Sequence, residues 1–127
     1  MIFGFDYKTN NNYDRNVKIQ NSGYAMKIDI EKKSPEIIFT VRGRIDTENS
    51  PAFQDSVEKN ITEDITNVIF DFNDVGYLAS AGIRVIIIAI KKIAEVKGTV
   101  KIINCFDNIR NVFDMVGLSS YLDNQKT

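Results

Sequence analysis

The stretch with the clearest chemical potential is residues 77–85, where very small side chains surround the hydroxyl of Ser80. Ala79 precedes this serine, and Ala81 and Gly82 follow it, so another molecule could approach the backbone closely. The same pattern also suits a sharp turn from a strand into a helix, with Ser80 as the N-cap. The stretch alone leaves both interpretations open.

The absence of histidine excludes much of the catalytic chemistry in which a serine could take part. The chain contains no histidine and one cysteine, Cys105, which rules out Ser-His-Asp and Cys-His catalysis. One cysteine is too few for a zinc site, and no P-loop or G-x-G-x-x-G sequence is present. We therefore expect a binding module without a metal or cofactor, and not an enzyme.

Length, charge and cysteine content indicate one ordinary globular domain. The chain has 127 residues, enough for a substantial core. A net charge of −1 gives no electrostatic basis for binding nucleic acid or an anionic membrane surface. The longest apolar run, residues 85–90, is too short to span a bilayer. A single cysteine cannot form an internal disulfide, so we expect a cytoplasmic protein.

Hydrophobic periodicity predicts strands and helices in alternation. Strands are expected over residues 25–30, 37–41, 67–72 and 99–104, and helices over residues 51–59, 81–97 and 107–116. Ser50 before Pro51 is expected to cap the first helix. Gly98 and Gly117 are expected to end the other two helices, and Gly43 suggests either a bulge or a close approach of another group near a strand end.

This order predicts an α/β fold: one domain with a small, mixed, mostly parallel sheet of four or five strands and three to four packed helices. The first strand should pair antiparallel with the second. In such sheets, binding residues gather at the carboxyl ends of the parallel strands. Asp46, Ser80 and Cys105 each follow a strand end, so we expect them on one rim. Taken alone, Asp46 could equally be a helix cap or a solvated loop charge.

The helix after Ser80 is expected to have an apolar face and a charged face. Its core residues should be Ile83, Ile86, Ile87, Ile90 and Ala94, and its charged residues Arg84, Lys91, Lys92 and Glu95. Ile88 lies among these charges, four residues after Arg84. It is either an ordinary exposed isoleucine or part of a contact surface with Ser80 and Arg84.

The two ends of the chain carry weaker signals. Residues 1–22 contain two candidate short strands separated by a polar run. We interpret them as an N-terminal extension, which could be an edge hairpin, a dimer-contact arm or a weakly ordered segment. Residues 23–122 are expected to form the domain, and residues 123–127 a polar tail.

Four short motifs resemble the successive signatures of the STAS domain. They are Gly-Arg-Ile-Asp at residues 43–46, Val-Ile-Phe-Asp-Phe at 68–72, Tyr-Leu-Ala-Ser-Ala-Gly-Ile at 77–83 and Val-Phe-Asp-Met-Val-Gly-Leu at 112–118. Each motif alone is weak, but four in the right order over residues 25–122 are specific. Within that family, the chain is most similar to the stand-alone anti-sigma factor antagonists.

This resemblance implies a phosphorylation switch. In that family, the serine of the strand–helix turn, here Ser80, is phosphorylated by the cognate anti-sigma factor, a serine kinase. The acidic residue of the first motif, here Asp46, lies beside it. Well-studied switching members often carry aspartate directly before the serine, where this chain has Ala79. The implied partner-binding surface consists of Asp46, Thr47, Ser80, Ile83, Arg84 and Ile88, bordered by Ala79, Ala81 and Gly82.

The expected partner is therefore an anti-sigma factor serine kinase, with a serine phosphatase and a second copy of the chain as further candidates. The unphosphorylated chain would bind the kinase and free a sigma factor, and phosphorylation would end that binding. The alternative is a non-switching STAS scaffold subunit of a transport ATPase or of a stress-sensing complex. A small-molecule or nucleotide binder has little support, because no glycine-rich phosphate loop is present.

Overall fold

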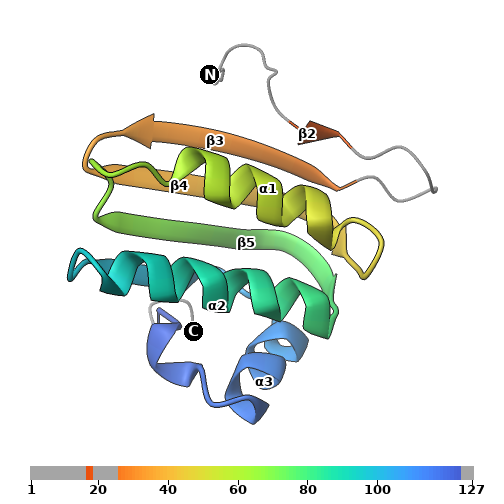
Figure 1. The fold of residues 1–127 in the computed structure, drawn as a ribbon. Coiled ribbons are helices and arrows are strands. Elements are labelled where there is room, and N and C mark those ends of the chain that lie inside the picture. Colours follow the sequence, from red (N-terminus) through yellow and green to blue (C-terminus); the bar gives the residue numbers. More distant parts are fainter. Residues whose placement is uncertain (1–16, 19–25, 124–127) are drawn as a thin grey trace.

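The computed structural model describes residues 17–18 and 26–123, which form one sheet with helices packed against it (Figure 1). The strands are β2 (Val17–Lys18), β3 (Lys27–Lys33), β4 (Glu36–Ile45), β5 (Asn67–Leu78) and β6 (Thr99–Ile103). The helices are α1 (Ser50–Asn60), α2 (Ser80–Ala94) and α3 (Asp107–Met115), followed by the 3₁₀ turn η1 (Ser119–Tyr121). Every strand and helix expected between residues 25 and 116 is therefore present.

The sheet has the spatial order β2-β3-β4-β5-β6. β2 pairs antiparallel with β3, and β3 pairs antiparallel with β4, whereas β4–β5 and β5–β6 are parallel pairs. The predicted α/β fold with a small mixed sheet is thus confirmed. β2 corresponds to one candidate strand of the N-terminal extension. The other expectations for residues 1–22, and those for residues 124–127, lie outside the described residues and stay predictions.

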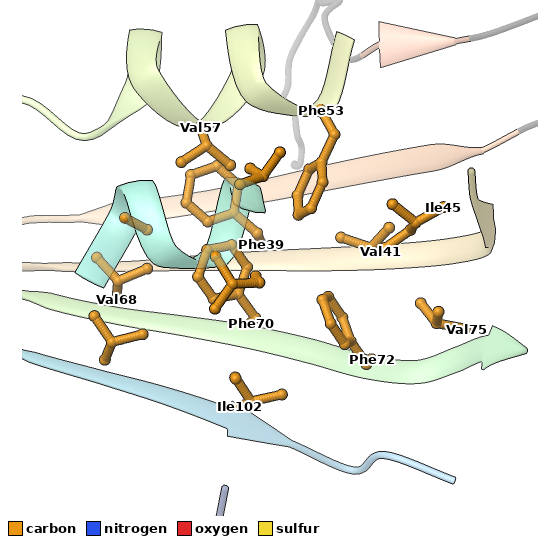
Figure 2. Close-up of a cluster of buried hydrophobic side chains, with 14 of the residues drawn as sticks. Phe39, Val41, Ile45, Phe53, Val57, Val68, Phe70, Phe72, Val75 and Ile102 are labelled. Carbon is orange, nitrogen blue, oxygen red and sulfur yellow. The ribbon is translucent and has the colours of Figure 1, made fainter. Parts of the chain in front are cut away.

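Phenylalanine rings are the largest side chains in the core between the sheet and the helices, where they pack among smaller aliphatic residues (Figure 2). Phe39 of β4 stacks on Phe70 of β5 with ring centroids 5.3 Å apart, and Phe53 of α1 meets Phe70 edge-on at 6.1 Å. On the same face of β5, Phe72 stacks on Phe113 of α3 at 6.3 Å. These ring contacts pack α1 and α3 against one face of the sheet. They also join the side chains of the two central strands, β4 and β5.

The central strands are longer than the sequence predicts. β4 continues past residue 41 to Ile45, and β5 continues past residue 72 to Leu78, with the pairing shifted between Thr40 and Arg42 and again after Gly43. Gly43 has a φ of 99°, a conformation that glycine adopts readily, so the bulge expected there is confirmed. The shifts in register let the polar segment after residue 72 continue to pair with β4, so both strands extend as far as Ile45 and Leu78.

Two predicted helix starts are wrong by one residue. Asn49, not Ser50, is the N-cap of α1, and Ala79, not Ser80, is the N-cap of α2. Ser80 has helical geometry from the outset, because Ile83 N–H already donates to the carbonyl of Ala79. Ser80 is therefore the first residue of α2 and has no capping role.

The glycine expected to end α2 has a different task. The left-handed residue after the helix is Lys97, with a φ of 58°, so the prediction that Gly98 is the C′ residue is wrong. A Cβ on Gly98 would lie 2.0 Å from the backbone oxygen of Thr66. Gly98 is thus needed for a close approach of two backbones. Gly117 does end α3 as predicted, with a φ of 80°.

The buried face of α2 consists of Gly82, Ile83, Val85, Ile86, Ala89 and Ile93. The predicted face is displaced by part of a turn, since Ile87 and Ile90 are only partly buried at the edge of the core and Ala94 is exposed. None of the helices in residues 26–123 is long and apolar enough to cross a membrane.

We predict that Gly98→Ala destabilises the fold by about 2–3 kcal/mol, because the new methyl group collides with backbone that cannot move aside. Gly76→Ala is the matched control: nothing lies within 4 Å of its Cβ position, so the free energy of unfolding should change by less than about 0.5 kcal/mol. Urea denaturation followed by circular dichroism measures both. Equal stability of the two variants would contradict the close contact with Thr66.

Candidate functional site

The ends of β4 and β5 bring the predicted site residues together. Ile45 and Leu78, the last residues of the two parallel strands, are paired, and Ala79 N–H donates to the carbonyl of Ile45 at 2.8 Å. Asp46 directly follows Ile45, and Ser80 directly follows Ala79. The structure thus places the Asp46 loop beside the first turn of α2, as the strand order predicts.

Ser80 stands at this junction with an exposed side chain. Its hydroxyl has no hydrogen-bond partner among the described residues. As the first residue of α2, it lies beside backbone N–H groups that have no partner within the helix. The site therefore offers a free hydroxyl oxygen at the positive end of a helix dipole.

A reciprocal pair of hydrogen bonds shapes the loop next to Ser80. The Asp46 N–H donates to Oδ1 of Asn49, and the Asn49 N–H donates to Oδ1 of Asp46, both at 2.9 Å. Asn49 Nδ2 also donates to the carbonyl of Arg44 at 2.9 Å, and Ser50 Oγ donates to the carbonyl of Asp46 at 2.6 Å. Asp46 is thus a half-buried loop residue, and one oxygen of its carboxylate already accepts a hydrogen bond from the loop backbone.

Asn49 is the residue that the sequence analysis missed. It is only 3% exposed, and its side chain ties the end of β4 to the start of α1. Asparagine and aspartate side chains often form hydrogen bonds with nearby backbone groups in loops that precede a helix. Two such residues three positions apart therefore indicate a loop of this kind. The sequence carries this signal, because Asp46 and Asn49 are three residues apart directly ahead of the Ser50-Pro51 helix start.

The small residues around Ser80 have different roles. A Cβ on Gly82 would lie 2.6 Å from Cγ2 of Ile45 and 2.7 Å from Cδ1 of Leu78. Gly82 is therefore small because α2 packs tightly on the strand junction, not because a partner approaches it. Ala79 and Ala81 are half-buried and border the exposed hydroxyl.

The surface beside Ser80 continues as a groove of about 460 Å³ between α1 and α2. Thr47 and Arg84 lie on it and are exposed. Ile88 is half-buried, one turn further along α2, whereas Ile83 is only 7% exposed and belongs to the core. Of the predicted partner surface, Ile83 therefore offers little to another molecule. The groove is lined by Thr47, Ser50, Pro51, Gln54, Asp55, Glu58, Ala81 and Arg84.

Cys105 does not join this site, contrary to the prediction of a shared rim. β6 stops pairing at Asp71 of β5, seven residues before the junction at Leu78, so the loop after β6 lies elsewhere. Cys105 is 2% exposed, and burial raises the pKa of its thiol to about 11. A protonated, inaccessible thiol has no chemical role at the surface. Within the described residues, no group of three or more cysteine, aspartate or glutamate side chains could hold a metal ion.

Comparison with known proteins identifies the domain. The family model described as "STAS domain" matches residues 27–127. BtrV of Bordetella bronchiseptica, named as a candidate anti-sigma factor antagonist, is 23% identical over 75% of this chain and 82% of its own length. The anti-sigma-B factor antagonist of Bacillus subtilis is 22% identical over 77% of this chain and 89% of its own length.

The fold also matches a solved structure. SpoIIAA of Bacillus, an anti-sigma factor antagonist whose phosphorylated form has been solved as well, superposes in its unphosphorylated form with a TM-score of 0.71. The two are 17% identical, and the match covers 76% of this chain and 85% of SpoIIAA. At this identity the similarity shows a shared fold.

We predict that Asn49→Ala destabilises the protein by about 2 kcal/mol, because two side-chain hydrogen bonds of a buried residue are lost. Asp46→Asn should change stability by less than about 0.5 kcal/mol, because an amide oxygen can still accept from the Asn49 N–H. Thermal unfolding of both variants measures the difference. If Asp46→Asn were the more damaging change, the carboxylate charge and not the hydrogen bond would hold the loop.

Proposed function

The chain belongs to the STAS domain family, and we propose that it is an anti-sigma factor antagonist: it binds an anti-sigma factor serine kinase and is switched off by phosphorylation of Ser80. One observation carries this proposal. The serine that corresponds to the family's phosphorylation site has an exposed hydroxyl at the first residue of α2. Relatives named as anti-sigma factor antagonists, aligned over most of the chain, support the choice of partner.

The free hydroxyl suits group transfer from a partner that supplies both the base and ATP. In the proposed reaction, Oγ of Ser80 attacks the γ-phosphorus of ATP, ADP leaves, and the hydroxyl proton passes to a base of the kinase. Asp46 would repel the incoming phosphate or help to place a Mg²⁺ ion brought by the kinase. The chain itself provides only the acceptor and its surroundings, so it acts as substrate and regulator.

The physical basis of the switch is a local change in charge and bulk. A phosphate adds roughly −1.5 to −2 charges at neutral pH. At the start of a helix, unpaired N–H groups and the dipole stabilise it by about 0.3–1 kcal/mol, so the domain should tolerate it. A partner that fits closely around a small, neutral hydroxyl is less tolerant, and a loss of a few kcal/mol lowers its affinity by roughly a hundredfold or more.

The surface for that partner surrounds Ser80. Thr47 and Arg84 are exposed on the neighbouring groove. Ile88, one helical turn beyond Arg84, adds a half-buried apolar contact. Asp46 follows the end of β4, beside the turn that carries Ser80. A partner that covered these residues would bury Ser80 at the centre of the contact, where a new dianion disturbs binding most.

The alternative is the non-switching scaffold subunit. Ala79 favours it, because switching members of the family often carry aspartate at that position. Such a subunit would bind its partner with an affinity that Ser80→Asp leaves unchanged, and it would co-purify with an ATPase or a scaffold protein.

We predict that incubation with the cognate kinase and ATP adds one phosphate at Ser80, located by mass spectrometry. Ser80→Ala should abolish the labelling. Ser120→Ala is the matched control, because Ser120 is also exposed, in η1, and its removal should leave labelling unchanged. Labelling that survives Ser80→Ala would remove the switch from the proposal.

A further inference from the structure

We infer that Arg84 is the internal counter-ion of phosphorylated Ser80, so that phosphorylation withdraws the Arg84 guanidinium from the surface that faces the partner. This inference rests on the proposed function for its biological meaning, because it concerns the modified form of Ser80. The contact itself is a property of this chain alone and requires no partner protein.

The helical spacing brings the two side chains together. Ser80 is the first residue of α2 and Arg84 the fifth, and residues four apart on a helix have Cβ atoms roughly 5–6 Å apart. Side chains on a helix lean toward its N-terminus, so Arg84 leans back toward Ser80 and not away from it. Ion pairs at this spacing are stronger when the anion precedes the cation, which is the order here.

Arg84 is available for this contact. Its side chain is exposed, and it takes part in no hydrogen bond or ion pair within residues 26–123 and β2. Arg42, by contrast, is already bound to Asp29, and Arg44 lies over the ring of Tyr77. A guanidinium can donate two parallel hydrogen bonds to a phosphate, which gives the pair direction as well as charge.

The other charged side chains that line the groove are acidic and come from α1, where Asp55 also pairs with Lys59 at 3.6 Å. Asp55 and Glu58 of α1 line the same groove, and Asp46 follows the end of β4 beside the Ser80 turn. These carboxylates raise the cost of placing a dianion here. A cation four residues away would offset part of that repulsion.

Two effects on the partner then act together. In the unmodified chain, Arg84 is free to face an acidic group of the partner across the groove. In the phosphorylated chain, the same guanidinium is turned onto the phosphate. The partner thus loses a positively charged contact at Arg84 and meets a partly neutralised phosphate. The net charge of the surface changes by that of the phosphate alone, but the positive charge has also moved.

The test uses the full chain with phosphoserine installed at position 80 during translation, and it therefore needs no kinase. The second pKa of the phosphate is measured by phosphorus NMR. Arg84→Gln should raise that pKa by roughly 0.3 unit, because the cation that favours the dianion is lost. Arg84→Lys should restore most of the difference. Lys92→Gln, two turns further along the same helix and exposed, is the control and should not change it.

A second signal reports on Arg84 itself. Its Nε–H resonance should shift when position 80 carries phosphoserine, and 1 M salt should reduce that shift because exposed charges are screened. If Arg84→Gln and the unaltered chain titrate alike, or if Lys92→Gln has the same effect as Arg84→Gln, the inference is wrong. Because the phosphate is installed directly, failure of the kinase to label Ser80 would refute the proposed function without affecting this result.

Discussion

The site depends on one feature of the sheet: the parallel pairing of β4 with β5 continues through two shifts in register to Ile45 and Leu78. The hydrogen bond from Ala79 N–H to the Ile45 carbonyl extends that contact into the turn. Gly82 then lets α2 press on the same two side chains. Because backbone pairing and close packing both fix this junction, the loop after β4 and the first turn of α2 are held side by side.

At this junction, residues that hold the fold lie next to an exposed hydroxyl. Ile45, Leu78 and Gly82 are buried and hold the fold, whereas Ser80, which lies between Leu78 and Gly82 in the sequence, is exposed. The Asp46–Asn49 hydrogen bonds give the adjoining loop a single shape without using Ser80. A change of charge at the hydroxyl can therefore alter the affinity of a bound molecule while the core stays intact. A switch of this kind requires no refolding.

The sequence predicted the architecture because its apolar periods are strong, and the order of strands and helices then brought Asp46 and Ser80 to neighbouring strand ends. It failed where tertiary contacts decide local structure. Residues 73–76 resemble a loop in the sequence, yet Asp74 and Val75 pair with β4 and keep the segment in a strand. Gly98 resembles a helix end, yet it is small because the backbone at Thr66 approaches it.

The measurement that bears most directly on the account is the affinity for the anti-sigma factor serine kinase, measured by calorimetry with Ser80 unmodified and with phosphoserine at that position. We expect tight binding of the unmodified chain and binding weaker by roughly a hundredfold or more after modification, with the thermal stability of the domain unchanged or raised. Equal affinities for the two forms would contradict the switch, and would leave the exposed hydroxyl of Ser80 without the role assigned to it.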